Sequence, residues 1–235
     1  MIKTFVTHSD IVKEQPSLQD RLQSSQVSFD EAIASAHSEM LLDLKNKKYN
    51  LRKLGVPLTI STSDAVTGTP PYLSDTSPED FVNYSIFVIE MLVNAEGDDY
   101  TFELQGSDDE DTWIKVATQY ANEVGVYSTI LYDYYKFYRV QISPTSESVT
   151  SNALTYSASL VESVYFYMHL YKSMESIYAT LGRRIDDFWE SKAIFYRNKY
   201  NGLLQTGVFY FDQDDDKLIS STDSNIDTRT IRIKL

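Results

Sequence analysis

The chain has 235 residues, of which 42% are hydrophobic, and carries a formal net charge of −13 with an isoelectric point near 4.6. This length is enough for one large domain or two smaller ones, and the apolar fraction excludes wholesale disorder. Because an acidic surface repels phosphates, general or sequence-specific binding of nucleic acid is disfavoured.

The absence of cysteine excludes disulfides, thiol catalysis and cysteine–zinc sites. It also fits synthesis in a reducing cytoplasm. No apolar run approaches the roughly 18 residues of a membrane span, and the first residues lack the features of a signal peptide. We therefore expect a soluble protein with no membrane partner. The 18 tyrosines are typical both of strands and of protein interfaces, and composition does not separate the two.

The N-terminal part of the chain is predicted to be helical. Residues 9–23 contain Ser9 and Asp10 as possible caps, and Pro16 interrupts them, so we expect one broken helix or two short ones. A longer helix follows over residues 28–54. Its apolar positions recur at helical spacing, and they are Phe29, Ile33, Ala36, Met40, Leu41, Leu44 and Leu51.

The ends of this longer helix have sequence signals of their own. Ser28 is followed three residues later by Glu31, which matches a capping box and predicts the start. Gly55 and Pro57 predict the end.

The middle of the chain is predicted to be a β-sandwich. Residues 55–80 are rich in Thr, Ser, Gly, Asp and Pro and are interpreted as a linker. Apolar or alternating segments follow, with a turn at 106–109, and the predicted strands are 85–94, 100–105, 113–117, 134–142 and 154–161. Strands at this spacing, with no helices between them, indicate an antiparallel sandwich.

Helical spacing returns in the last third, from Val164 to Leu203. Gly182 interrupts it, so the segment is either one kinked helix or a helical hairpin around that residue. Asn201 and Gly202 are a plausible C-terminal stop.

The predicted fold class is therefore α+β, a helical bundle split by an inserted antiparallel β-sandwich and followed by an extended C-terminal tail. The division is 1–54 and 161–210 for the two halves of the bundle, 55–160 for the sandwich, and 211–235 for an acidic loop and tail.

The motifs of catalysis are missing from the sequence. It has no nucleophile elbow and no phosphate loop, and its 34 acidic residues make carboxylate pairs expected by chance. The histidines are isolated, and His169 lies beside the apolar stripe of the third helix, where a packed structural role is favoured. We expect a protein that is not an enzyme.

One acidic segment resembles the calcium loop of an EF-hand. Its candidate ligands are Asp212, Asp214, Asp216, Leu218 through its carbonyl, and Asp223. However, Lys217 replaces the glycine of the sharp turn, and Asp223 is shorter than the usual glutamate. An acidic surface loop without metal is the favoured interpretation, and a Ca²⁺ site is the alternative.

The C-terminal helix supports a family resemblance. The run Ile185–Tyr200, followed by Tyr210-Phe-Asp-Gln-Asp-Asp-Asp, resembles the C-terminal helix and loop of tailed-bacteriophage head-to-tail connector proteins, the adaptor or head-completion proteins that ring the portal. A helix such as 28–54 is also usual there. The resemblance covers under half of the chain. The composition is similar in style to that of ring proteins of crAss-like phages.

This resemblance implies a structural virion protein at the portal–tail junction. It would form a homo-oligomeric ring, with twelve-fold symmetry expected, and its partners would be the portal protein and further tail or collar proteins. The inserted sandwich departs from the minimal family pattern.

The sandwich carries the alternative function. Phe102–Trp113 and Tyr138–Ile142 resemble jelly-roll or discoidin-type virion and carbohydrate-binding modules, so the chain is alternatively a glycan-binding or decoration protein. Trp113 or Tyr127 would serve as an aromatic platform. The competing interpretation, which we favour, is that Trp113 packs between the sheets.

The last residues, 225–235, alternate strand-forming and basic side chains from Thr230 onward. A short strand is not stable alone, so it must pair with the chain's own sheet or with another protein. We expect docking on an acidic neighbour. The residues expected to bind are Arg229, Ile231, Arg232, Ile233, Lys234 and Leu235. The alternative is an extra strand on the chain's own sandwich.

Overall fold

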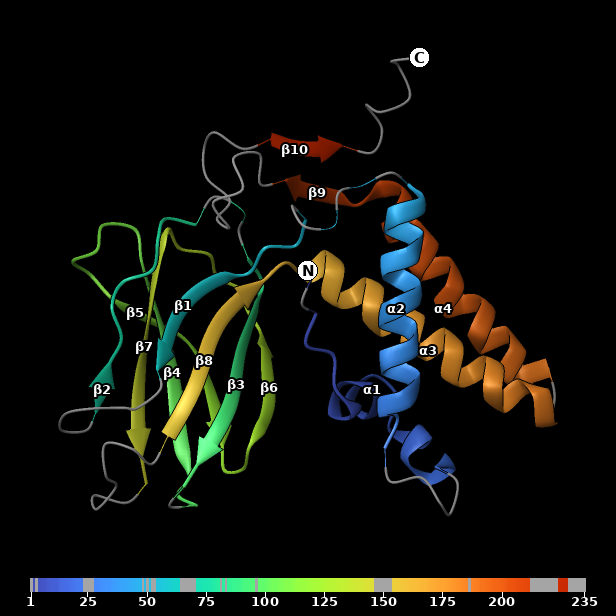
Figure 1. Cartoon of the computed structure of the whole chain (residues 1–235), viewed down its shortest axis with the longest axis horizontal. Coiled ribbons are helices and arrows are strands. Elements are labelled where there is room, and N and C mark those ends of the chain that lie inside the picture. The colour runs from blue at the N-terminus through green and yellow to red at the C-terminus, as the bar shows by residue number, and fades with distance from the viewer. Residues whose placement is uncertain are drawn as a thin grey trace. The chain divides into compact units, whose positions relative to one another are not determined.

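The computed structural model describes residues 2, 4–22, 28–47, 49, 51, 54–63, 71–80, 82, 84–95, 97–145, 154–185, 187–211 and 224–227. In these ranges it has five helices, two four-stranded antiparallel sheets and a two-stranded sheet, which confirms the α+β class (Figure 1).

The described chain divides into two compact units. The helical unit comprises residues up to Gly55, then Val164–Phe211 and 224–227, and the β unit comprises Val56–Ser163. Among the described helices, none combines the length and the apolar content that crossing a bilayer requires.

Two short helices come first along the chain, α1 at His8–Glu14 and the 3₁₀ helix η1 at Pro16–Arg21. The backbone N–H and the hydroxyl of Thr7 both donate to the Asp10 carboxylate at 2.8 Å. The N-cap is therefore Thr7, and Asp10 closes the cap from the third helical position. Pro16 starts η1, because proline is compatible with a first helical turn but not with the interior of α1.

Helix α2, Asp30–Asn46, differs from its prediction at both ends. The Ser28 hydroxyl bonds the Asp30 side chain, so the predicted Ser28–Glu31 capping box does not form and Phe29 is the N-cap. The helix ends at Asn46, well before Gly55. Its last buried apolar side chain is Leu44. Because packing of an apolar face sustains most protein helices, the exposed basic turn after Leu44 unwinds.

Helices α3, Ser163–Ile185, and α4, Asp187–Thr206, form an antiparallel hairpin, as one of the two alternatives predicted. The predicted turn at Gly182 is wrong, because α3 continues through that residue to Ile185. The rings of Tyr178 and Tyr196 stack between them, with centroids 5.7 Å apart and planes at 9°. The predicted stop at Gly202 is wrong, because α4 continues to Thr206. The helix ends where the Gly207 N–H donates to the Leu203 carbonyl at 2.8 Å.

After α4, β9 (Val208–Phe211) pairs antiparallel with β10 (Ser224–Asp227). The core of the helical unit thus draws on the N-terminal segment, α2, α3, α4 and β9. Its buried members are Ile2, Met40, Leu44, Leu54, Tyr165, Met168, Tyr200 and Phe209. Burial of a large apolar side chain is worth about 1.5–3 kcal/mol, so residues more than 150 positions apart hold this unit together.

The β unit contains two four-stranded sheets, which Figure 1 shows as two layers. One has the order β1-β8-β3-β6, and its strands are Leu58–Ser63, Leu154–Val161, Ile86–Asn94 and Gly125–Ile130. The other has the order β2-β7-β4-β5, and its strands are Tyr72–Leu73, Phe137–Pro144, Tyr100–Ser107 and Ile114–Ala121. Phe102 and Tyr156, one from each sheet, meet with ring centroids 5.5 Å apart, so the layers share a core.

Three strands of the β unit, β1, β2 and β6, were not predicted, and neither was β9 of the helical unit. β1 and β2 lie in the segment interpreted as a linker, where serine and threonine obscure the alternation. β4 also runs through Gly106 and Ser107, so the turn falls later than predicted. Gly106 is required in this strand, because a Cβ there would lie 2.3 Å from the Tyr135 ring.

Candidate functional site

The two sites predicted at the C-terminus lie outside the described residues. These are the calcium loop, Asp212, Asp214, Asp216, Leu218 and Asp223, and the docking tail, Arg229, Ile231, Arg232, Ile233, Lys234 and Leu235. The described beginning of the tail, Ser224–Asp227, pairs with β9 of the same chain. Elsewhere in the described ranges no group of three or more His, Asp or Glu side chains is arranged to hold a metal ion.

His169 of α3 is buried and structural, as its sequence position predicts. Its Nε2 lies 2.7 Å from the Ile33 carbonyl oxygen of α2, and its Nδ1 bonds the Thr4 hydroxyl. Nε2 therefore carries the proton and Nδ1 accepts from threonine, in the neutral tautomer. Burial, together with a smaller effect of the neighbouring His37 ring 5.0 Å away, lowers the pKa of His169 to about 4.

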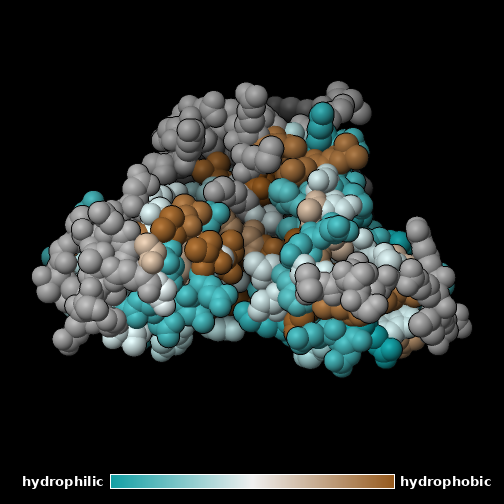
Figure 2. Space-filling model, turned by 60° about the horizontal axis from the view of Figure 1, so that its bottom comes forward, coloured by the Kyte–Doolittle hydropathy of each residue, from teal (hydrophilic) through white to brown (hydrophobic). Residues whose placement is uncertain are grey.

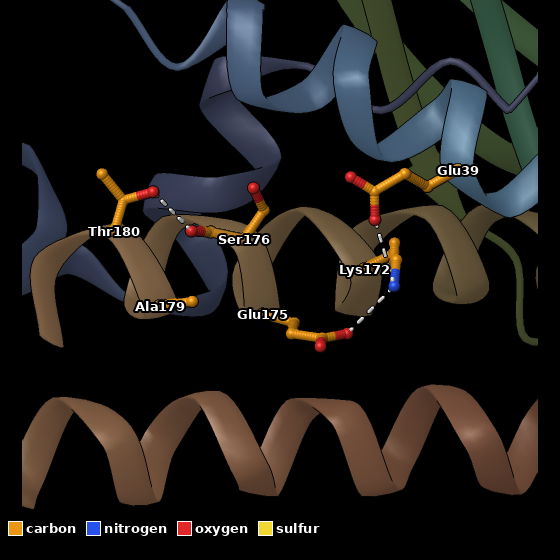
Figure 3. Close-up of a pocket in the computed structure, with 6 residues that line it drawn as sticks. All are labelled: Glu39, Lys172, Glu175, Ser176, Ala179 and Thr180. Carbon is orange, nitrogen blue, oxygen red and sulfur yellow. Dashed lines mark hydrogen bonds and ion pairs between the residues drawn. The ribbon is translucent and has the colours of Figure 1, made fainter. Parts of the chain in front are cut away.

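A charged cluster joins the three long helices. The ammonium of Lys172 lies 3.2 Å from the Glu39 carboxylate and 3.4 Å from that of Glu175. Glu175 also accepts from Arg197 of α4 at 2.7 Å. Figure 3 shows Lys172 between its two carboxylates. These residues line a polar pocket of about 200 Å³ that Ser176, Ala179 and Thr180 complete. These charges are paired with one another, so the cluster fixes helix positions.

The outer side of α4 exposes aromatic side chains. Phe188 is 57% exposed and Phe195 is 48% exposed, two turns apart on one face of the helix. Lys192 lies 5.9 Å from both ring centroids, and Lys199 lies 4.8 Å from that of Phe195. We name these four residues the α4 stripe. Figure 2 shows a face of the molecule on which hydrophobic residues gather in a few patches among hydrophilic ones.

Trp113 does not pack between the two sheets, so that interpretation was wrong. Its Nε1 donates to the Glu110 carbonyl at 3.0 Å, and the guanidinium of Arg139 lies 4.1 Å from the indole centroid. Arg139 alternates along β7 with the buried Tyr138 and Val140, so the indole lies with the outward side chains of that sheet. Sequence alternation alone does not show this, because Trp113 precedes β5 and its direction depends on the loop before it.

The loop that carries Trp113 is held by its own hydrogen bonds. Asp109 Oδ1 accepts from the Ser107 hydroxyl at 2.9 Å and from the backbone N–H groups of Asp111 and Thr112 at 3.0 and 2.8 Å. These bonds lower the pKa of Asp109. Glu110, whose carbonyl receives the indole N–H, adopts a left-handed φ of 63°. The loop therefore fixes the position of Trp113 in the free protein, so the side chain is preorganised for binding.

Beside Trp113, polar side chains of three strands form a connected array. Arg139 Nε donates to Gln105 Oε1 at 2.8 Å, and Gln105 Nε2 donates to Glu103 at 3.0 Å and to Gln141 at 3.3 Å. Lys115 of β5 completes it, 2.9 Å from Glu103. Hydrogen bonds from Gln105 and Lys115 lower the pKa of Glu103, so its carboxylate is ionised.

Tyr127, the other aromatic residue considered as a platform, is engaged locally. Its hydroxyl donates to the Glu123 carbonyl at 2.8 Å and receives the Glu123 N–H at 3.1 Å. It therefore closes the turn between β5 and β6, which belong to different sheets.

No protein-family model matches this chain. A comparison with curated proteins found no match either.

Proposed function

We propose that this chain is a structural ring subunit of a tailed-bacteriophage head-to-tail connector, at the junction of portal and tail in the virion. In this proposal the helical unit is a connector-type bundle, and the sandwich is a jelly-roll-like insertion. The subunits form a twelve-fold ring on the portal protein, and the C-terminal tail docks on a neighbouring tail or collar protein. The resemblance of Ile185–Tyr200 to connector helices motivates it.

The observation that carries the proposal is the α4 stripe. Phe188 and Phe195 each expose about half of their surface, although α4 is well packed on its other side through Ala193, Tyr196 and Tyr200. Exposed aromatic side chains grouped on one rigid face are typical of protein interfaces. The helix bearing them is the one that carries the connector resemblance.

The occupant of the stripe is a second copy of this chain. Lys192 and Lys199 place two ammonium groups on the stripe, and that of Lys199 also pairs with Glu14 at 3.8 Å. The chain's charge of −13 makes the surface of a neighbouring copy acidic on average. Such complementarity favours contact between two different surfaces of identical subunits. Contacts of this head-to-tail kind close into rings when the rotation between subunits allows it.

Native mass spectrometry of the protein alone and with a portal ring tests this proposal. We expect a defined large oligomer, formed alone or on the portal, and its loss in the double variant Phe188→Ser, Phe195→Ser. Tyr132→Ser, at a position that is 84% exposed in the β unit, is the matched control and should assemble normally.

Circular dichroism of each variant checks that it is folded. A stable two-fold dimer, or no assembly on the portal, would contradict the ring. A ring that forms equally well with both phenylalanines replaced would contradict the assignment of the interface to α4.

A further inference from the structure

The outward side of the sheet β2-β7-β4-β5 carries a set of side chains that the packing of the sandwich does not require. In the strand register, Glu103 faces Gln141 of β7, and Gln105 lies between Arg139 of β7 and Lys115 of β5. A bulge in β5 opposite Leu104 and Gln105 places Lys115 beside Gln105. Three strands therefore present amide, guanidinium, ammonium and carboxylate groups in one surface.

Arg139 is the member of this set with unused bonding capacity. Its Nε bonds Gln105 and its plane lies over the Trp113 indole. Of the carboxylates that the structure describes, none forms an ion pair with Arg139. The carboxylate in the same array, Glu103, is paired with Lys115. Partial burial lowers the pKa of Arg139 without removing its charge. A guanidinium held flat in this way directs its remaining N–H groups at a ligand.

The chemistry of the surface selects the class of ligand. Arg139 and Lys115 donate, Glu103 accepts, and Gln105 and Gln141 do both, which matches hydroxyl groups that both donate and accept. An indole beside these groups contacts the apolar C–H face of a sugar ring.

An anionic ligand fits less well, because the loop bearing Trp113 contains the run of acidic residues Asp108–Asp111.

We propose that this face binds a neutral glycan, with Arg139 and Gln141 bonding vicinal hydroxyls and Trp113 lying against the sugar ring. The neighbouring Glu103, Gln105 and Lys115 orient these groups. The site does not depend on ring assembly, so it gives the sandwich a surface-attachment role in addition to the proposed structural one.

A glycan array of neutral and acidic oligosaccharides, probed with the full chain, tests the proposal. Each neutral glycan bound is then titrated by calorimetry against Arg139→Lys and Gln141→Ala. Lysine keeps the charge but loses the planar fork, so affinity should fall by about tenfold or more in the first variant. Gln141→Ala should also weaken binding. Leu92→Gln, at an exposed position in the other sheet, is the control and should bind as the original chain does.

The outcomes separate clearly. Neutral-glycan binding that both variants weaken and the control retains supports the site. Three results would overturn the proposal: no glycan bound on the array, a preference for acidic glycans, or binding unchanged in Arg139→Lys. Thermal unfolding of each variant distinguishes loss of ligand contact from loss of fold. Because the titration uses the free chain, its result stands apart from that of the ring experiment.

Discussion

Nε2 of His169 in α3 lies 2.7 Å from the carbonyl oxygen of Ile33 in α2. On the other side of the ring Nδ1 bonds Thr4, which precedes α1 in the N-terminal segment. One neutral imidazole thus joins three segments of the helical unit, and its protonation and its partners are both open to test.

The first prediction concerns pH. The pKa of His169 falls from 6.5 to about 4 in the folded protein, because burial disfavours the cation. Between these values the unfolded chain binds a proton that the folded chain does not. The stabilisation is therefore full above pH 6.5 and is lost as the pH falls toward 4, by on the order of 3 kcal/mol.

Urea unfolding at a series of pH values measures this loss. His169→Gln, whose side chain does not titrate, should show a shallower decline of the free energy of unfolding between pH 6.5 and 4. An identical decline in both proteins would contradict the assignment to His169.

The second prediction concerns Thr4, the partner of His169. Thr4→Val keeps the shape but leaves Nδ1 of the buried imidazole without its donor, so we expect the free energy of unfolding to fall by about 1–2 kcal/mol. Thr180→Val is the control, because Thr180 is exposed and bonds only its own helix at the Ser176 carbonyl. Chemical denaturation of the two variants should differ clearly, and equal losses would count against the Thr4–His169 bond.

The third prediction uses two glycines that have open space around them. Gly202 lies inside α4 and a Cβ there meets nothing within 4 Å, so Gly202→Ala should stabilise the protein by about 0.5–1 kcal/mol. Gly97 is equally open but has a φ of +68°, so Gly97→Ala should destabilise it by about 1 kcal/mol. Thermal melts show whether each change raises or lowers the stability of the protein. Destabilisation by Gly202→Ala would instead indicate that α4 ends at this residue.

The fourth prediction concerns the contact between α4 and α2. The hydroxyl of Tyr200 donates to Asp43 at 2.8 Å, and Tyr200 is buried in the core of the helical unit. Tyr200→Phe should therefore cost about 1–2 kcal/mol of unfolding free energy. Tyr171→Phe, at a partly buried ring stacked on Tyr167, is the matched control with an expected change below ~0.5 kcal/mol. Similar losses in both would show that the bond to Asp43 is not the cause.

Local patterns in the sequence determined the kinds of element and much of their order. The helical period of 28–44 and of 164–203 depends only on which side chains avoid water, and so does the alternation of Tyr100–Gln105. These patterns were sufficient for the α+β class. The alternation of apolar and polar residues was less clear in β1, because its outward positions are serine and threonine, which are also common in loops.

Tertiary contacts decided the ends of the elements and the directions of single side chains. Helix α2 ends at Asn46, and Leu51 and Leu54 still reach the core from the chain beyond it, whereas α4 continues through Gly202 with Leu203 and Leu204 packed against the core. Trp113 lies outward because Asp109 and Glu110 shape its loop. The polar array beside it depends on register across three strands, and contacts between residues distant in the chain are not encoded in any local period.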